Sequence, residues 1–309
     1  MNTITVFFEK IIAFFTGIFT LIASFFGFAA PQQSVAPDYY LNIKSDYAIE
    51  QHYINKGEYD VSYIEYDTDD KVVVKYEIWY PTELESANKK YPMVVMMNGS
   101  GVLASLYKAI FNHLASWGFI VIGNEDPSTG AGISADKMLS FMYGENDNPD
   151  SIFYNKIDIE NIGVAGHSQG GAGVFSALSI TENCSIFKTG VAISPAHEES
   201  STALGWAYEL DKISVPVMMV SGNVGKFENE IVIPFDKMQN MYAKIKSDKL
   251  MAVRDGCDHD QMLYMADGYM TAWLMWHLQG DSYAAGAFTG DNAEIFNNTS
   301  WKDVKRNFS

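Results

Sequence analysis

The sequence IGVAGHSQGG, residues 162–171, sets one serine between glycines immediately after a short apolar run. The apolar residues 162–165 show no polar alternation, which is typical of a strand buried on both faces. Residues 172–178 begin a helical pattern behind the motif. A strand, a sharp turn and a helix in this order lift the hydroxyl of Ser168 above the sheet, where it can act as a nucleophile. An ordinary glycine-rich turn is the alternative, because so short a pattern also arises by chance.

Short apolar runs of the same kind recur along the chain, at residues 93–97, 119–123, 190–193, 215–220 and 250–253. Apolar residues spaced three and four apart lie between several of these runs, as in amphipathic helices. Ahead of them, residues 71–80 alternate in polarity, as a half-buried antiparallel strand does. Strands that alternate with helices indicate one α/β domain whose central sheet is mostly parallel and flanked by helices.

The N-terminal segment has a different character. Residues 11–30 carry no charge, and twenty such residues in a helix would cross ~30 Å of hydrocarbon. Lys10 precedes this run and acidic residues follow it, which favours a location of the remaining chain outside the cytoplasm. We expect residues 1–30 to form a hydrophobic helix that is a membrane anchor or a signal segment, so that the protein is membrane-anchored or secreted; a buried core helix is the alternative. Residues 31–57 then form a linker and lead-in, and residues 58–309 the catalytic domain.

Charge and cysteine content exclude several classes of protein. The chain has 38 acidic and 21 basic residues, a formal net charge of −17, which argues against a nucleic-acid partner because phosphate contacts need a basic surface. Two cysteines, Cys184 and Cys257, are too few for a disulfide framework or a four-thiolate zinc site. A single disulfide between them stays open.

A serine nucleophile needs a base and an orienting carboxylate, which should follow it along the chain. His259 lies in the loop after the run 250–253, at the end of a late strand where open α/β sheets place their sites. His197 also follows a strand and is the alternative base. The loop after the run 215–220 contains no aspartate but offers Glu228 and Glu230. A glutamate carboxylate can hold the imidazole tautomer as an aspartate does.

Two backbone N–H groups should stabilise the oxyanion of the reaction. The residue after the nucleophile, Gln169, is expected to supply one of them. The loop after the run 93–97 is expected to supply the other, with Ser100 as its donor. Glycines at positions 99 and 101 let this loop approach a substrate closely.

These motifs carry a family resemblance. From about residue 58 onward the chain resembles the cutinase-like polyester hydrolases and related lipases of the α/β-hydrolase superfamily. Residues 166–171 are similar to the family's G-H/W-S-M/Q-G-G motif, and residues 228–234 are similar to its E-N-D-x-V-x-P segment. Residues 256–259 resemble the short loop that holds its catalytic histidine. The resemblance implies an α/β-hydrolase fold and a triad of Ser168, His259 and Glu230, with Glu228 as the alternative acid.

The chain also departs from the family pattern. Ser100 stands where polyester-cleaving members often have Tyr or Phe, and Ala196 stands where they commonly have Trp. An aromatic clamp is therefore missing at both places, and the family's cysteine pair is not intact. We expect Gly99, His167 and Ala196 to contribute to substrate binding.

Taken together, the sequence predicts a serine ester hydrolase that forms an acyl-enzyme and acts on short to medium acyl or polyester-type esters. No cofactor or metal is required for this chemistry. The expected partners are the ester substrate and, through the N-terminal segment, a membrane. Two alternatives stay open, namely a lipase or phospholipid-acyl hydrolase at the membrane and a catalytically silent, membrane-tethered binding protein.

Overall fold

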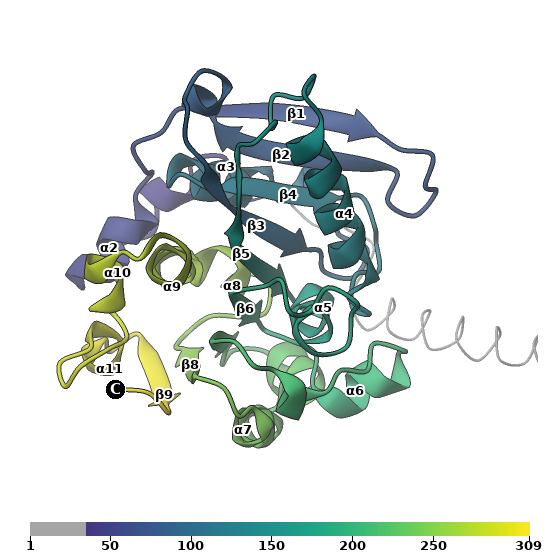
Figure 1. Ribbon diagram of the computed structural model, residues 1–309. Coiled ribbons are helices and arrows are strands. Elements are labelled where there is room, and N and C mark those ends of the chain that lie inside the picture. Colours follow the sequence, from purple (N-terminus) through teal and green to yellow (C-terminus); the bar gives the residue numbers. More distant parts are fainter. Residues whose placement is uncertain (1–34) are drawn as a thin grey trace, which may run out of the picture. The chain divides into compact units, whose positions relative to one another are not determined.

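Nine strands form one mixed sheet in the computed structural model, which describes residues 35–309 (Figure 1). Their order is β1-β2-β4-β3-β5-β6-β7-β8-β9. The six central strands run parallel: β3 (Tyr91–Met97), β4 (Ile120–Asn124), β5 (Ile157–His167), β6 (Thr189–Ile193), β7 (Val217–Gly222) and β8 (Lys249–Arg254). Antiparallel strands complete the two edges: β1 (Val61–Asp67) and β2 (Lys75–Pro81) at one, and β9 (Trp301–Arg306) at the other. The mostly parallel α/β sheet that the sequence predicted is confirmed.

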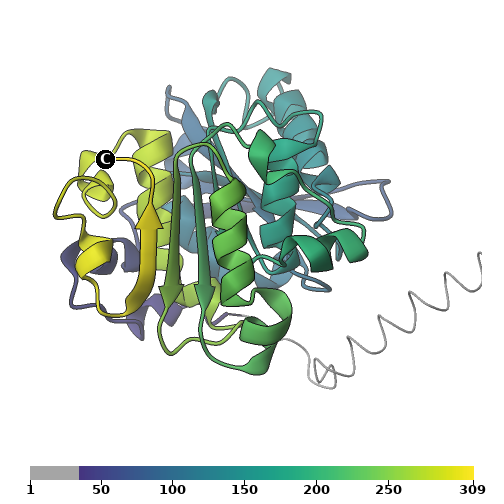
Figure 2. The same ribbon diagram turned by 90° about the horizontal axis from the view of Figure 1, so that it is seen from below.

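Helices cover both faces of the sheet, which explains why the central strands are largely apolar and deeply buried. Every residue of β4, β6, β7 and β8 is buried, whereas β1 alternates between half-buried and exposed positions. One face packs against α3 (Lys108–Ser116) and α9 (Asp267–Gln279). The opposite face packs against α4 (Ile133–Asp147), α5 (Gln169–Ser179) and α7 (Phe235–Lys244). Figure 2 shows these two groups of helices on either side of the strands.

Two helices end at the glycines that the sequence suggested. Gly118 follows α3 with φ 93°, and Gly280 is the C-terminal cap of α9 with φ 70°. Both angles lie in the left-handed region, which glycine adopts without steric cost. The short helix α8 (Met262–Met265) precedes α9 and links it to the loop that carries His259.

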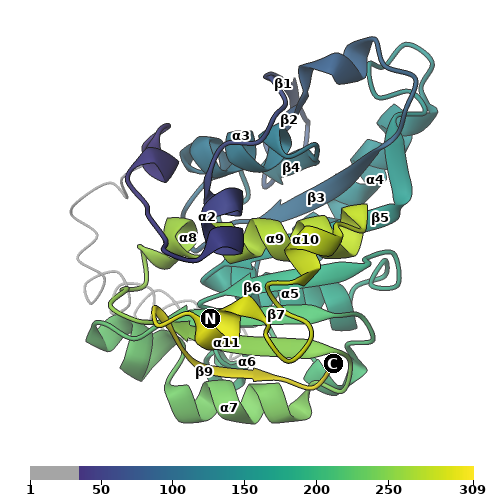
Figure 3. The ribbon, with the colours of Figure 1, turned by 90° about the vertical axis from the view of Figure 1, so that its left-hand side faces the viewer.

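Residues 39–54, which we expected to be a lead-in, are packed onto the domain. They form η1 (Tyr39–Leu41) and α2 (Ala48–Ile54), and α2 lies against α9 (Figure 3). Tyr53 is fully buried, and the hydroxyl of Tyr39 donates a hydrogen bond to Asp267 Oδ2 in α9 at 2.7 Å. The packed body therefore begins ahead of residue 58.

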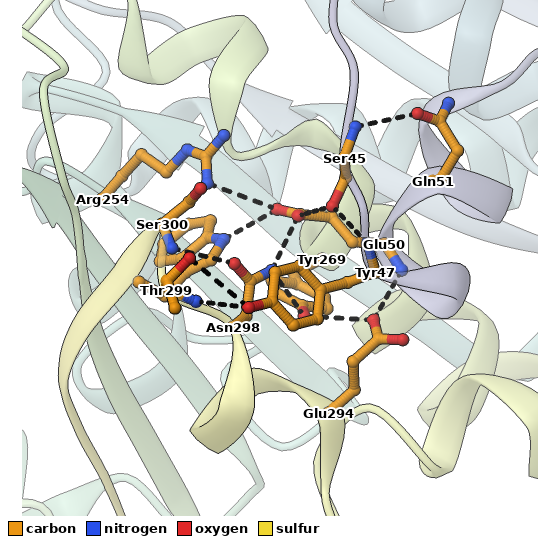
Figure 4. A network of polar contacts seen from close by, with 11 residues as sticks. Ser45, Tyr47, Glu50, Gln51, Arg254, Tyr269, Glu294, Asn298, Thr299 and Ser300 are labelled. Atoms are coloured by element: carbon orange, nitrogen blue, oxygen red, sulfur yellow. Dashed lines mark hydrogen bonds and ion pairs between the residues drawn. The ribbon is translucent and has the colours of Figure 1, made fainter.

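A buried carboxylate joins this segment to the C-terminal part of the chain (Figure 4). Glu50 of α2 is 1% exposed and accepts hydrogen bonds from Ser45 Oγ at 2.5 Å, Asn298 Nδ2 at 2.8 Å and Trp301 Nε1 at 2.7 Å. Glu294 accepts hydrogen bonds from the backbone amides of residues 49 and 50, at 2.7 and 2.8 Å. Three donors satisfy the oxygen atoms of Glu50 and so compensate the cost of burying this polar group.

The expected hydrophobic helix and membrane anchor or signal segment fall within residues 1–34, which lie outside the described residues. Across positions 35–309, no helix combines the length and the apolar character needed to cross a bilayer. Cys184 and Cys257 are both free thiols, so the disulfide that stayed open from the sequence is not formed.

Candidate active site

The predicted strand, turn and helix around Ser168 are present. Strand β5 ends at His167, α5 begins at Gln169, and Ser168 between them has φ 60° and ψ −121°. A positive φ is uncommon for a residue other than glycine and is often found at functional sites. The turn leaves Ser168 partly exposed, although its neighbours on both sides are buried.

Two glycines of the motif are required by close packing. A Cβ atom on Gly166 would lie 2.4 Å from the carbonyl oxygen of Gly170. A Cβ atom on Gly170 would lie 2.0 Å from the carbonyl oxygen of Met97, at the end of β3. Both distances are shorter than any van der Waals contact, so the sharp turn forms only with glycine at these positions.

His259 lies in the loop after β8, as predicted, and three side chains contact its ring. Nδ1 lies 2.6 Å from Glu228 Oε2. The rings of His167 and Phe227 pack against it, with centroids 4.6 and 4.7 Å from that of His259. His259 is only 6% exposed, so its orientation is set by these neighbours.

His167 supports His259 through the backbone. Its Nε2 atom lies 2.8 Å from the carbonyl oxygen of His259. Burial lowers the pKa of His167 to about 3, so the ring is neutral at pH 7, and Nε2–H is the donor to this carbonyl. The His167 side chain, which we expected to bind substrate, is buried against the His259 loop.

The carboxylate beside His259 belongs to Glu228, and the prediction that Glu230 pairs with it is wrong. Both residues lie in η5 (Phe227–Val232), a single π-helical turn after β7. Side chains two positions apart in a helical turn point to different sides. Glu228 is completely buried and faces His259, whereas Glu230 is exposed to solvent.

Glu228 is ionised because both oxygens of its carboxylate have hydrogen-bonding partners. Oε2 is paired with His259, and Oε1 accepts hydrogen bonds from Ser194 Oγ at 2.6 Å and from the backbone amide of Gly222 at 2.8 Å. Burial by itself raises the pKa of Glu228, but the hydrogen bond and charge of His259, together with the other two donors, outweigh it. The net effect holds the pKa of Glu228 below its usual value.

The two expected oxyanion donors lie on segments that meet at Ser168. A Cβ atom on Gly99 would lie 3.6 Å from Ser168 Cβ, so the loop after β3 adjoins the nucleophile position. The amide of Gly99 donates to the Tyr107 hydroxyl at 2.8 Å, which anchors this loop next to Ser100. Helix α5 begins directly after Ser168, and the amide of residue 172 donates a hydrogen bond to the Ser168 carbonyl at 3.2 Å. Gln169 lies in the first turn of this helix. The N–H groups of the first turn have no partner within a helix, so the amide of Gln169 is available as a donor.

The other candidate residues lie nearby but in different contacts. The side chain of the alternative base His197 makes a different contact: its Nε2 atom lies 2.8 Å from Ser200 Oγ. The amide of Ala196 points to the Ser168 carbonyl at 3.4 Å, so this position does adjoin the turn. Within residues 35–309, no three His, Cys, Asp or Glu side chains come together as ligands for a metal ion.

Three neighbours of the site were not identified from the sequence. Ser194 binds Glu228, and Phe227 packs on His259. The third neighbour, Trp206, lies close to Gln169, and both side chains pack next to Gly130. A Cβ atom on Gly130 would lie 2.5 Å from Trp206 Cγ and 2.9 Å from Gln169 Cγ. No sequence pattern marks these contacts, since each joins two segments that are more than 30 residues apart in the chain.

Comparison with known families agrees with this geometry. The family model described as PETase, PET hydrolase-like, matches residues 56–303. The chain belongs to this family. A comparison with curated proteins finds no match. The PETase family comprises cutinase-like polyester hydrolases of the α/β-hydrolase superfamily, so the protein is a carboxylic ester hydrolase. The resemblance that residues 166–171 and 228–234 carried is thereby confirmed at the level of the family.

Proposed function

We propose that the protein hydrolyses esters through a triad of Ser168, His259 and Glu228. The observation that carries this proposal is the 2.6 Å contact between His259 Nδ1 and Glu228 Oε2, beside a strained turn that presents Ser168. A nucleophile, a base and a group that orients the base are the parts that acyl transfer needs.

In the first half of the proposed reaction, Ser168 Oγ attacks the carbonyl carbon of the ester. His259 Nε2 takes the hydroxyl proton, and the carbonyl oxygen becomes an oxyanion that accepts hydrogen bonds from the amides of Ser100 and Gln169. The tetrahedral intermediate collapses, the bond from carbon to the alcohol oxygen breaks, and His259 gives its proton to the departing alcohol. The acyl group stays on Ser168 Oγ.

In the second half, water attacks the acyl-enzyme while His259 Nε2 takes one of its protons. Collapse of the second intermediate releases the carboxylic acid and returns the proton to Ser168. Glu228 remains ionised throughout, because its task is to hold Nδ1–H of His259 and to stabilise the imidazolium that forms in each half. The depressed pKa of Glu228 suits this role.

The substrates we propose are short to medium acyl esters and aliphatic polyester-type esters. Ser100 and Ala196 provide no ring at the two positions where the family resemblance implies an aromatic clamp. A small side chain at both positions reduces the area that an aromatic acid could stack on. We therefore expect weak action on aromatic polyesters.

The test uses p-nitrophenyl esters from acetate to palmitate, a serine-directed phosphonate and the variant Ser168→Ala. We expect turnover to be highest on the shorter esters, one phosphonate per chain on Ser168 by peptide mass, and a loss of kcat on the order of 10⁶ in Ser168→Ala. A phosphonate on another serine, or more than a few per cent of wild-type activity in the variant, would refute the proposal.

A further inference from the structure

Ser194 lies immediately after β6, and its side chain is hydrogen-bonded to Glu228. Its side chain is fully buried, and Oγ donates a hydrogen bond to Glu228 Oε1 at 2.6 Å. The carboxylate has no proton to offer when ionised, so the serine hydroxyl must be the donor. This contact uses the only hydroxyl hydrogen of Ser194, which therefore serves the carboxylate alone.

The backbone at Ser194 is held in an unusual conformation that places this hydroxyl. Its φ is 43°, a region that residues other than glycine rarely adopt. Its amide donates to the carbonyl oxygen of Val220 in β7 at 2.7 Å, and the amide of Ser168 donates to the carbonyl of Ile193 just before it at 2.9 Å. Strained backbone persists where its surroundings hold it in place and is frequent at functional sites.

The need for such a contact follows from the choice of glutamate. A glutamate side chain has one more rotatable bond than aspartate, so its carboxylate has more orientations to lose. Ser194 Oγ and the Gly222 amide both bind Oε1, which leaves Oε2 directed at His259 Nδ1. Two fixed donors on one oxygen thus set the rotation of the whole carboxylate.

We propose that Ser194 is a positioning residue that orients the Glu228 carboxylate toward His259. This inference rests on the proposed function, because it assigns a partner to the acid of that triad. Ser194 does not touch the reacting atoms, so its contribution passes entirely through Glu228.

The test compares Ser194→Ala with Ser194→Gly on p-nitrophenyl acetate. Both remove the hydroxyl, but only glycine also relieves the positive φ, so equal losses in the two variants identify the hydroxyl as the cause. We expect kcat to fall roughly 10-fold in each variant, with KM within twofold of wild type, as for the loss of a hydrogen bond to a charged group. Thermal unfolding of Ser194→Gly reports that the fold is kept.

A double-mutant cycle separates positioning from a merely structural effect. In a Glu228→Gln background, removal of the Ser194 hydroxyl should cost less than twofold in kcat, because the residue it acts through is already gone. A full 10-fold loss in that background, or unchanged kcat in both single variants, overturns the inference. Ser168→Ala in the same assay separates the two proposals. If Ser168→Ala is active, the proposed function itself is refuted. If Ser168→Ala is inactive, a negative result in the Ser194 variants refutes only the role of Ser194.

Discussion

His259 Nδ1 lies 2.6 Å from Oε2 of Glu228, and the second oxygen of the same carboxylate is bound by a serine hydroxyl and a backbone amide. Glu230, two residues further along the same π-helical turn, is exposed. The orientation of one short turn therefore decides which of two glutamates can serve as the acid. The packing around that turn is therefore as much a part of the candidate site as the side chains that would carry out the reaction.

A buried carboxyl group away from the site should limit stability at neutral pH. Glu77 in β2 is completely buried, and burial together with the neighbouring Glu125 raises its pKa to about 7, although Lys75 opposes the shift. The pKa of Glu77 in the folded protein is higher than its value of about 4.5 in the unfolded chain, so the folded state favours the protonated carboxyl group. The free energy of unfolding should therefore fall as the pH rises from about 4.5 to 7.

Glu77→Gln should therefore stabilise the protein at pH 8, by about 2 kcal/mol, and raise Tm by about 5 °C. At pH 4.5 the same variant should unfold within a degree of wild type. Differential scanning calorimetry at the two pH values measures this. Glu65→Gln, a change at an exposed glutamate opposite Glu77 on β1, is the matched control and should give no gain at pH 8. An equal gain at both pH values would contradict the linkage argument.

Loss of the Glu50 carboxylate should destabilise the domain without altering the site. The two oxygens of Glu50 accept hydrogen bonds from Ser45, Asn298 and Trp301. In Glu50→Gln an NH₂ group replaces one of these oxygens, so two buried hydrogen-bond donors face each other without an acceptor. We expect a loss of about 2–4 kcal/mol in the free energy of unfolding, measured by urea titration. Kinetic constants on p-nitrophenyl acetate should stay as in wild type below the transition. The exposed Glu58, changed to Gln, is the control and should unfold like wild type.

Removal of the segment before β1 should be tolerated only up to a defined point. A chain that begins at Val35 keeps η1 and α2, so we expect wild-type activity on short soluble esters and an unchanged Tm. A chain that begins at Gly57 loses Tyr53 and Glu50 from the core and should express as insoluble or unfolded protein. Thermal unfolding of both chains measures the difference. Equal stability would mean that α2 contributes nothing to the fold.

Much of the fold could be predicted because its signals are local. The buried strands and the turn at Ser168 depend on residues adjacent in sequence, and both appear where the pattern placed them. His259 could be predicted as well, since it follows the late strand β8 at its carboxyl end, where open α/β sheets place their sites. These features need only the periodicity of strands and helices and the order of the chain.

The contacts that could not be predicted join distant parts of the chain. Trp301 reaches Glu50 across 251 positions, so nothing near either residue indicates that residues 39–54 belong to the core. The choice of Glu228 over Glu230 depends on a π-helical turn, which has no distinctive sequence pattern and which rotates Glu228 inward. The alignment of the segment with the family motif therefore pointed to Glu230, whereas the glutamate in contact with His259 is Glu228.

The measurement that tests the account most directly is the comparison of Glu228→Gln with Glu230→Gln in steady-state hydrolysis of p-nitrophenyl acetate. The two changes are chemically identical and lie two residues apart, but only one removes the carboxylate from His259. We predict that kcat falls by about 10³–10⁴ in Glu228→Gln and stays within twofold of wild type in Glu230→Gln. A large loss in Glu230→Gln with little change in Glu228→Gln would contradict the account.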